Sequence, residues 1–197
     1  MNLGIIILAA GSASRMGTPK QLLDIHGKSL LLRVIENCLD LKGHKVTVVL
    51  GANKALIKPT LEGLPINIVE NDQWETGMSS SIKMGLVGSY MIDKNIDGVI
   101  VVAGDMPSVS ELHLRSLLEK AQKTDKHIVA SSYGDILGVP SLFKREILNE
   151  LLDLEGDKGA AQVFQKHKAQ IVHVPLGHSS VDIDTKEDYF NYLNSQN

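Results

Sequence analysis

The sequence is poor in several features that mark particular classes of protein. Only 4% of its 197 residues are aromatic, and 20 basic residues stand against 23 acidic ones. This balance argues against binding to long nucleic acids, because such proteins usually show a basic excess and aromatic side chains on which bases stack. The one cysteine, Cys38, excludes an intramolecular disulfide and fits a reducing compartment, where a buried, inert thiol is expected.

Long apolar runs, low-complexity tracts and linkers are also absent from the sequence. The first apolar run, residues 3–8, is too short for a membrane span or a signal peptide, and no cationic region precedes it. No stretch rich in proline, glycine or serine divides the chain. We therefore expect a cytoplasmic protein without a membrane partner, folded as a single domain over residues 1–197.

Segments typical of strands alternate with segments of helical periodicity. The spacing predicts strands at residues 3–8, 45–50, 66–69, 97–102, 128–131 and 171–174. It predicts helices at residues 30–39, 55–62, 77–91, 111–121, 144–152, 159–166 and 186–193, with Ser29 and Ser110 as N-caps. This alternation predicts an α/β fold, a Rossmann-like, mostly parallel sheet flanked by helices on both faces.

The loop that follows the first predicted strand carries two cations, Arg15 and Lys20, among small residues that include Gly11 and Gly17. Glycine lets backbone N–H groups approach an anion closely, while arginine and lysine supply charge for phosphate oxygens. The spacing matches neither of the two common glycine-rich phosphate loops. The loop therefore predicts a triphosphate site of another kind, with an ordinary turn carrying two solvated cations as the alternative.

Carboxylates occur at two places where a metal could bind. Asp105 follows a buried strand, and Mg²⁺ favours one or two carboxylates completed by water and phosphates. A turn aspartate before Pro107 is the alternative for Asp105. In an extended segment Asp182 and Asp184 project to the same side, where a cation would relieve their repulsion. We assign the metal to Asp105 and Asp182, with Asp184 in support and Thr185 or Asp184 capping the helix that follows.

Three consecutive serines begin the helix predicted at residues 77–91. Hydroxyls and unpaired N–H groups at a helix start can bind a base or a phosphate, whereas simple capping would need only one serine. Ligands in parallel sheets bind outside the carboxyl ends of the strands, so the Arg15 loop and Asp105 are expected to face one site.

The motif L-A-A-G-S-A-S-R-M-G-T-P-K-Q-L-L, at residues 8–23, resembles the signature of the nucleotidyltransferases with a glycosyltransferase-A-like, Rossmann-related fold. This is the MobA-like, nucleotide-diphospho-sugar-transferase-like group, and the likeness is closest to its molybdenum cofactor cytidylyltransferases. In that wider family the loop wraps the triphosphate of an incoming nucleotide. The resemblance implies catalytic roles for Arg15, Lys20 and Asp105, and nucleotide binding by these three residues with Leu8, Ala9, Ala10, Gly11, Ser80 and Ser81.

Other landmarks of this family recur along the chain. The D-x-P sequence at Asp105 matches a metal ligand of the family, and residues 182–185 resemble its D-I-D-T-P-E-D element, with Lys186 where proline is commoner. The family's G-M-S-S-S-I segment lies near the nucleotide, so the resemblance implies that Ser81 reads the pyrimidine edge. Trp74 matches an N-x-x-W landmark, either as a core residue or as a stacking platform.

The acceptor side departs from the family pattern. Residues 156–160 resemble its G-D-x-G-A-R element, but Ala161 stands where arginine is usual. The resemblance therefore places Asp157 and Lys158 beside the acceptor, with Lys158 as a replacement cation. Gly138, in the Gly-Val-Pro landmark at residues 138–140, implies a loop over the acceptor, or a plain turn.

The resemblance implies transfer of CMP from CTP to the phosphate of a molybdopterin-type acceptor, with Mg²⁺ as the metal and pyrophosphate as the second product. A molybdenum hydroxylase apoenzyme or its maturation factor would be a further partner. CTP is favoured because Ala10 stands where related guanylyltransferases carry glycine, although one methyl group discriminates by only about 1–3 kcal/mol. The alternatives are a guanylyltransferase, a sugar- or polyol-phosphate nucleotidyltransferase, and a non-catalytic cofactor delivery protein.

Overall fold

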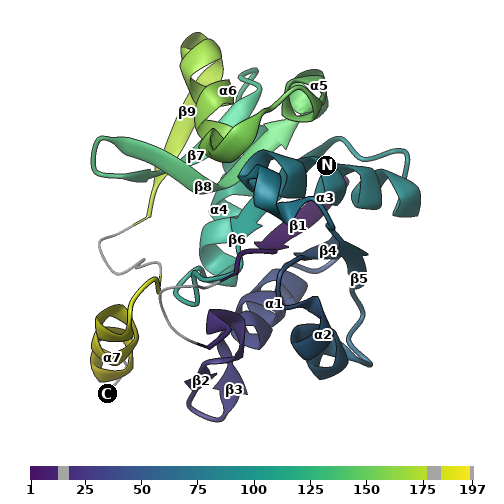
Figure 1. The fold of residues 1–197 in the computed structure, drawn as a ribbon. Coiled ribbons are helices and arrows are strands. Elements are labelled where there is room, and N and C mark those ends of the chain that lie inside the picture. The colour runs from purple at the N-terminus through teal and green to yellow at the C-terminus, as the bar shows by residue number, and fades with distance from the viewer. Residues whose placement is uncertain (13–17, 177–182, 196–197) are drawn as a thin grey trace.

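The computed structural model describes residues 1–12, 18–176 and 183–195, and its centre is a seven-stranded sheet in the order β5-β4-β1-β6-β8-β7-β9 (Figure 1). The strands of this sheet are β1 (Leu3–Ala9), β4 (Lys45–Leu50), β5 (Asn67–Glu70), β6 (Gly98–Ala103), β7 (Ile128–Tyr133), β8 (Ile136–Lys144) and β9 (Ile171–Pro175). A separate hairpin contains β2 (Asp24–Ile25) and β3 (Lys28–Ser29). Strands β5, β4, β1 and β6 are mutually parallel, which confirms the mostly parallel sheet.

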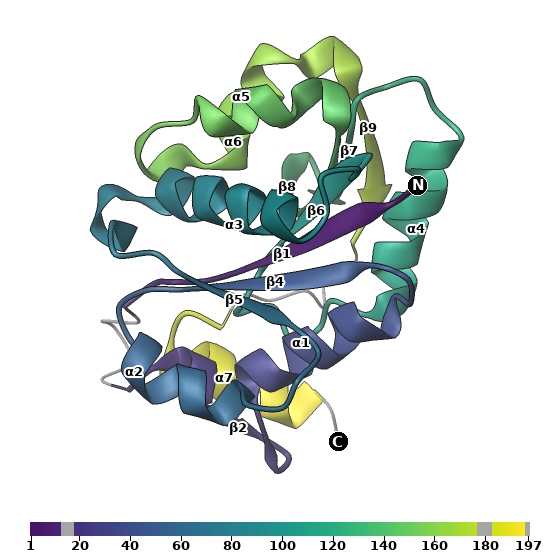
Figure 2. The same cartoon turned by 90° about the vertical axis from the view of Figure 1, so that its right-hand side faces the viewer.

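Helices cover both faces of the sheet, as the alternation predicts (Figure 2). Apolar side chains of α1 (Leu30–Asp40), α2 (Lys54–Ile57), α4 (Glu111–Gln122) and α7 (Lys186–Ser195) belong to one buried cluster. Those of α3 (Met78–Ile92), α5 (Leu148–Leu152) and α6 (Ala160–Lys166) belong to the other. Short 3-10 helices complete the chain: η1 (Lys20–Leu22), η2 (Lys58–Leu61), η3 (Trp74–Thr76), η4 (Arg145–Ile147), η5 (Gly156–Lys158) and η6 (Lys168–Gln170).

Both predicted N-caps are confirmed. The hydroxyl of Ser29 accepts a hydrogen bond from the Leu32 N–H at the start of α1, and that of Ser110 accepts one from the His113 N–H at the start of α4. Cys38 is buried on the inner face of α1, and this burial raises the pKa of its thiol to about 12, as expected for an inert side chain. Among the described helices, none combines the length and apolar composition that crossing a membrane requires.

The order of the strands creates a crevice at one edge of the sheet. The chain passes from β1 outward through β4 to β5, and then returns to form β6 on the other side of β1. The connections that leave β1 and β6 therefore diverge in opposite directions. Such a switch point is where open α/β sheets bind their ligands, just beyond the carboxyl ends of the strands.

The expectation of a loop or plain turn at Gly138, Val139 and Pro140 is wrong, because these residues lie inside β8. β8 runs antiparallel to β6 and β7, and its register with β7 shifts from Ser141 opposite Ala130 to Gly138 opposite Ser131. Val139 and Pro140 form a bulge between these two pairs, and the peptide bond that joins them is cis. Proline is tolerated here because a bulge requires no N–H group for the ladder.

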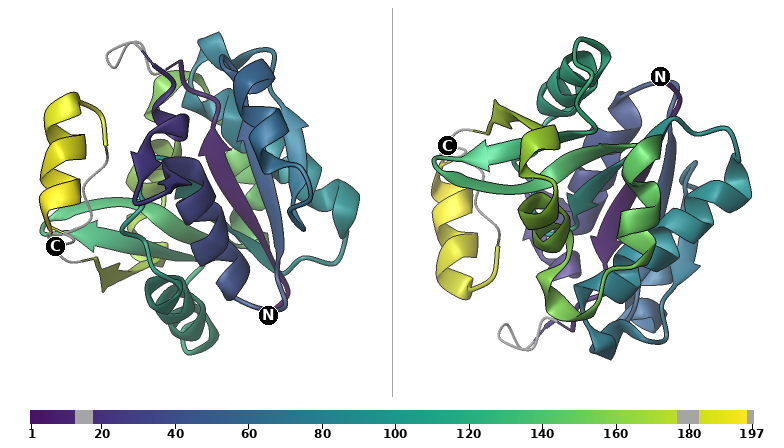
Figure 3. Two further views of the ribbon diagram at one scale, coloured as in Figure 1. Left: turned by 90° about the horizontal axis from the view of Figure 1, so that it is seen from below. Right: turned by 90° about the horizontal axis from the view of Figure 1, so that it is seen from above.

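Two predicted helices also differ from the structure. The segment predicted as one helix at residues 55–62 is split into α2 and η2, because Pro59 lies at the start of a new 3-10 turn. The helix predicted from Lys144 begins later, since Lys144 still pairs with Gly98 as the last residue of β8. Helix α7 lies against the small hairpin, where the Tyr189 hydroxyl donates to the Asp24 carbonyl, and Figure 3 shows this helix at the flank of the molecule.

Candidate functional site

A cavity of about 540 Å³ lies at the switch point of the sheet. Residues 8–12, which end β1 and continue beyond it, form one part of its wall, and residues 103–105, at the end of β6 and just beyond it, form another. The start of α3 contributes Gly77, Met78 and Ser81, while Trp74 and Glu75 come from the turn before it. The expectation that the first loop and Asp105 face one site is therefore met by the described part of that loop.

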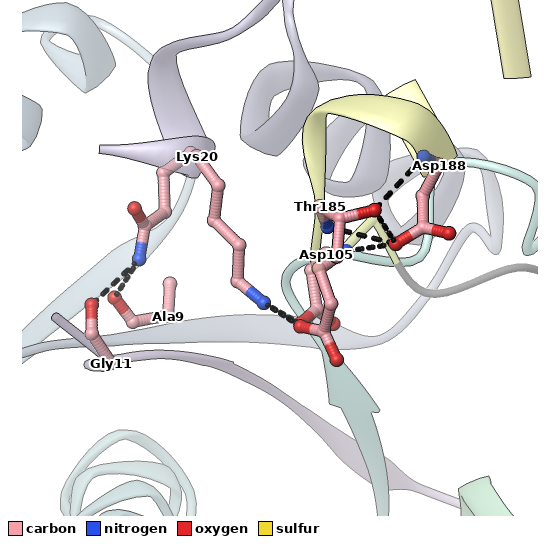
Figure 4. Close-up of polar contacts among 8 residues, drawn as sticks. Ala9, Gly11, Lys20, Asp105, Thr185 and Asp188 are labelled. Atoms are coloured by element: carbon pink, nitrogen blue, oxygen red, sulfur yellow. Dashed lines mark hydrogen bonds and ion pairs between the residues drawn. The ribbon is translucent and has the colours of Figure 1, made fainter. Parts of the chain in front are cut away.

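Three charged side chains meet at this cavity (Figure 4). The ammonium group of Lys20 lies 2.5 Å from Asp105 Oδ2 and 2.7 Å from Asp184 Oδ1. Burial alone lowers the pKa of Lys20, but attraction to Asp105 and Asp184 outweighs that effect and raises the pKa above its usual value. Lys20 therefore stays cationic at neutral pH, at the point where two carboxylates converge.

The segment that carries Asp184 is fixed beside Asp105 by contacts on both sides. Ile183 is fully buried, and its N–H donates to the backbone carbonyl of Asp105 at 3.1 Å. Thr185 caps α7, because the Asp188 N–H donates to the Thr185 hydroxyl while Thr185 donates back to the Asp188 carboxylate (Figure 4). These donors hold the pKa of Asp188 below its usual value. Asp188 and Thr185 thus satisfy the helix start, and the Asp184 side chain faces Lys20 instead.

The oxygens around Asp105 suit a hard divalent cation. Asp105 Oδ1 is buried and has no hydrogen-bond partner in the part of the chain that the structure describes. No cluster of three or more histidine, cysteine or acidic residues occurs among the described residues, so they hold no closed protein-only metal cage. A carboxylate with a free oxygen, a second carboxylate nearby and an open cavity are what Mg²⁺ needs when phosphates supply its other ligands. Arg15 and Asp182 lie outside the described residues.

The serines at the start of α3 occupy different surroundings. Ser81 is buried and lines the cavity, and Asn71 donates hydrogen bonds to the hydroxyls of both Ser80 and Ser81. Ser80 lies outside the lining of this cavity, faces a neighbouring one, and donates to the Gly77 carbonyl. Trp74 is half-buried, packs against the core and lines the cavity, so its core role is confirmed and stacking of a base on its ring stays a prediction.

The residues expected on the acceptor side are only partly at the cavity. Asp157 lines it and accepts a hydrogen bond from the Met78 N–H at 3.3 Å. Gly77 allows this contact, because a Cβ there would lie 2.5 Å from the carbonyl carbon of Gly156. Gly138 and Lys158 fall outside the lining, and it is Val139, pushed out by the bulge in β8, that reaches the cavity.

Two lining residues have a structural role that motif reading did not assign. Gln21 follows Lys20 in the motif, is 3% exposed, and donates to the carbonyls of Ala9 and Gly11 (Figure 4). A polar residue within an otherwise apolar Q-L-L sequence is the signal that could have singled it out. Val139 carries no such signal, because its place depends on a bulge formed by pairing with a distant strand.

Comparison with known proteins places this geometry in a family. Residues 5–171 match the model of the MobA-like NTP transferase domain. The bifunctional protein GlmU of Coxiella burnetii (strain CbuK_Q154) is 28% identical over 199 residues, which cover 100% of this chain and 42% of the relative. The chain thus spans about two fifths of the length of that curated relative.

Solved structures share the fold over nearly the whole chain. Rv0371c from Mycobacterium tuberculosis has a TM-score of 0.83 at 24% identity, covering 98% of this chain and 99% of its own, and it has also been solved with manganese. The 4-diphosphocytidyl-2C-methyl-D-erythritol synthase from Anaerococcus prevotii has a TM-score of 0.78 at 18% identity, with 100% and 96% coverage. The switch-point cavity, its charged cluster and the match over residues 5–171 lead to one conclusion: the chain belongs to the MobA-like NTP transferase family and is a nucleotidyltransferase.

Proposed function

We propose that the protein transfers CMP from CTP to the phosphate of a molybdopterin-type acceptor and releases pyrophosphate. The observation that carries the proposal is the meeting of Lys20, Asp105 and Asp184 at the cavity whose wall is formed by residues 8–12. A cation, hard oxygen ligands and a phosphate-binding loop are the parts that direct nucleotidyl transfer requires.

The reaction needs no nucleophilic side chain. An acceptor phosphate monoester is largely ionised at neutral pH because its second pKa is about 6. One of its oxygens forms a bond to the α-phosphorus of CTP as the bond from that phosphorus to the β-bridging oxygen breaks. Pyrophosphate carries away the negative charge that develops, and Lys20 and Arg15 offset it. The raised pKa of Lys20 keeps that charge available across the physiological range.

Asp105, with Asp182 or Asp184, would hold Mg²⁺ at this position. The buried, unpartnered Oδ1 of Asp105 and the nearby carboxylate of Asp184 support this assignment within the described residues. When bound, the metal would draw charge from the phosphate oxygens. Asp105 would orient the metal, and the positive charge of Lys20 would offset the negative charges of the two carboxylates.

The preference for CTP is supported by the wall around Ala10. Ala10 lines the cavity and is 6% exposed. Gly51 packs directly behind it, since a Cβ on Gly51 would lie 2.8 Å from the Ala10 Cβ. Ala10 therefore has no room to move back for a larger base. Ser81, which lines the same cavity, would supply the hydrogen-bonding group for the edge of a pyrimidine.

Two observations favour a second class of acceptor. A sugar or polyol phosphate is the alternative acceptor, and the likeness to a 4-diphosphocytidyl-2C-methyl-D-erythritol synthase favours the polyol. Ala161, where the cytidylyltransferases carry arginine, points the same way.

Pyrophosphate release tests both halves. Purified protein with Mg²⁺ is incubated with CTP, GTP or UTP, each paired with molybdenum cofactor, a sugar phosphate or methylerythritol phosphate. Fastest release with CTP and molybdenum cofactor is expected. A preference for GTP would overturn the choice of base, and turnover only with sugar or polyol phosphates would overturn the acceptor. Nucleotide binding without release in any pairing would instead favour a delivery protein that serves a molybdenum hydroxylase or its maturation factor.

A further inference from the structure

Each backbone carbonyl from residue 8 to residue 12 accepts a hydrogen bond from a group elsewhere in the chain. The donors are Gly104 N to Leu8 O (2.8 Å), Gln21 Nε2 to Ala9 O (3.2 Å) and Gly11 O (3.1 Å), Ala52 N to Ala10 O (3.0 Å), and Asn53 Nδ2 to Ser12 O (3.3 Å). The wall of the cavity is thus fixed by backbone groups of two neighbouring loops and by two amide side chains.

Fixing a carbonyl also fixes an N–H group, because the two point in opposite directions across a planar peptide unit. The carbonyls of Ala9, Ala10 and Gly11 are turned toward their donors, so the N–H groups of the residues that follow each of them are turned the other way. Among the described residues, no acceptor is found for the N–H groups of Gly11 and Ser12. These donors are therefore held ready for an anion at the cavity.

Gln21 is the residue of this set whose side chain donates hydrogen bonds to two carbonyls. Its side chain is 3% exposed, and its amide must point its nitrogen at Ala9 and Gly11, because the flipped amide would set oxygen against both carbonyls. Gln21 also lies in η1 directly after Lys20. The same 3-10 turn therefore contacts the loop carbonyls through the Gln21 side chain and the carboxylates of Asp105 and Asp184 through the Lys20 side chain (Figure 4).

We propose that Gln21 is a positioning residue for the triphosphate. It touches neither nucleotide nor metal in this role, but it orients the peptide units whose N–H groups bind the β- and γ-phosphates. This inference rests on the proposed nucleotidyl transfer and concerns phosphates only. It is therefore independent of which base or acceptor the protein prefers.

The test compares Gln21→Glu, Gln21→Met and a matched control, Gln162→Glu. Gln162 also donates its amide to a backbone carbonyl, that of Glu155, but it lies outside the lining of this cavity. Binding of the best-bound nucleoside triphosphate and of the corresponding monophosphate is measured by calorimetry for each protein, with thermal unfolding as the check on folding. Loss of two hydrogen bonds and misdirection of the N–H groups is expected to weaken triphosphate binding at least about tenfold in Gln21→Glu. Monophosphate binding is expected to change by less than about threefold, and Gln162→Glu should bind both as the wild type does.

A second measurement keeps the inference separate from the choice of substrate. Amide hydrogen exchange of the peptide containing residues 8–12, in the ligand-free protein, is expected to speed up in Gln21→Met and Gln21→Glu but not in Gln162→Glu. The positioning role would be overturned if Gln21→Glu weakened triphosphate and monophosphate binding equally. It would also be overturned if a folded Gln21→Glu protein showed unchanged amide exchange and unchanged triphosphate binding. A wild-type preference for a nucleotide other than CTP would overturn the proposed function and leave this comparison intact.

Discussion

The two halves of the molecule supply the cavity in different ways. The parallel half, from β1 to the turn after β6, provides most of the lining. Ala10 and Asp105 come from just beyond the carboxyl ends of β1 and β6, and Lys20 comes from η1. The half that begins with α4 contributes only Val139, Asp157 and Asp184 among the described residues, from a bulge, a 3-10 turn and the segment before α7. Strand ends thus build the wall at which we propose that the triphosphate binds, whereas the later half reaches the cavity with irregular backbone.

This difference suggests a division of labour. The backbone of residues 8–12 is fixed by hydrogen bonds from several loops, which suits a triphosphate whose shape does not vary between substrates. The later half is where insertions and bulges change a surface without disturbing the sheet. We therefore expect acceptor choice to depend on the later half, and each of the following experiments separates the two contributions.

The largest effect is expected from Asp105→Ala. It removes the carboxylate that pairs with Lys20 and whose free oxygen suits a metal, so turnover is expected to fall by about 10³-fold or more while the fold survives. Steady-state pyrophosphate release measures the loss, with circular dichroism as the folding check. Asp135→Ala, at an exposed turn between β7 and β8, is the control and should keep full activity. An active Asp105→Ala protein would contradict the assignment.

Gly77→Ala tests the contact that joins the two halves. Gly77 has a φ of 111°, and an added Cβ would meet the Gly156 backbone at 2.5 Å, whereas Gly63, with a φ of 81°, has open space around it. Gly63→Ala is expected to lower the free energy of unfolding by about 1 kcal/mol through backbone strain alone. Gly77→Ala should cost about 1–3 kcal/mol more because of overpacking. Urea unfolding gives both changes in the free energy of unfolding. Equal changes would show that the contact between Gly77 and Gly156 does not contribute to stability.

Lys158→Ala separates acceptor binding from nucleotide binding. If Lys158 replaces the arginine missing at Ala161, the KM for the acceptor should rise about tenfold, as expected for one lost charge-assisted hydrogen bond. The KM for CTP should not change. Lys120→Ala, on the exposed surface of α4, is the control for loss of a lysine charge. A rise in both KM values would place Lys158 with the nucleotide instead.

The smallest effect concerns His113, which supports the bulge in the later half. Its Nε2 lies 2.7 Å from the Ser131 hydroxyl, which donates to the Pro140 carbonyl. Burial lowers the pKa of His113 below its ordinary value of about 6.5. The unfolded chain therefore takes up a proton first, so the free energy of unfolding should fall as the pH drops below about 6.5. His113→Gln keeps a donor for Ser131 and should flatten this dependence in chemical unfolding at several pH values. An unchanged slope would show that other groups govern it.

The sequence was more informative about the parallel half than about the later one. Strand–helix alternation acts locally, so the parallel sheet could be predicted, and the capping serines Ser29 and Ser110 likewise gave one helix start in each half. β8 was missed because glycine and proline at residues 138–140 usually mark a turn. Only pairing with β6 and β7 makes that stretch a bulged strand.

The candidate site shows the same limit. Lys20 and Asp105 could be anticipated, because charged residues directly after buried strands or in a glycine-bearing loop have few structural reasons to be there. The polar character of Gln21 was visible in the sequence, but its two carbonyl partners and the contact of Asp184 with Lys20 were not, because these contacts depend on how separate segments meet. The roles of Arg15 and Asp182 remain predictions, since these residues lie outside the described part of the chain.

A crystal structure of the protein soaked with CTP and Mg²⁺ is the most direct measurement. We predict the triphosphate against the backbone of Gly11 and Ser12, with Lys20 beside it, the metal on Asp105, and the cytosine between Ala10 and Ser81. A nucleotide bound elsewhere on the molecule, or a metal with no contact to Asp105, would contradict the proposal that the switch-point cavity is where nucleotidyl transfer takes place.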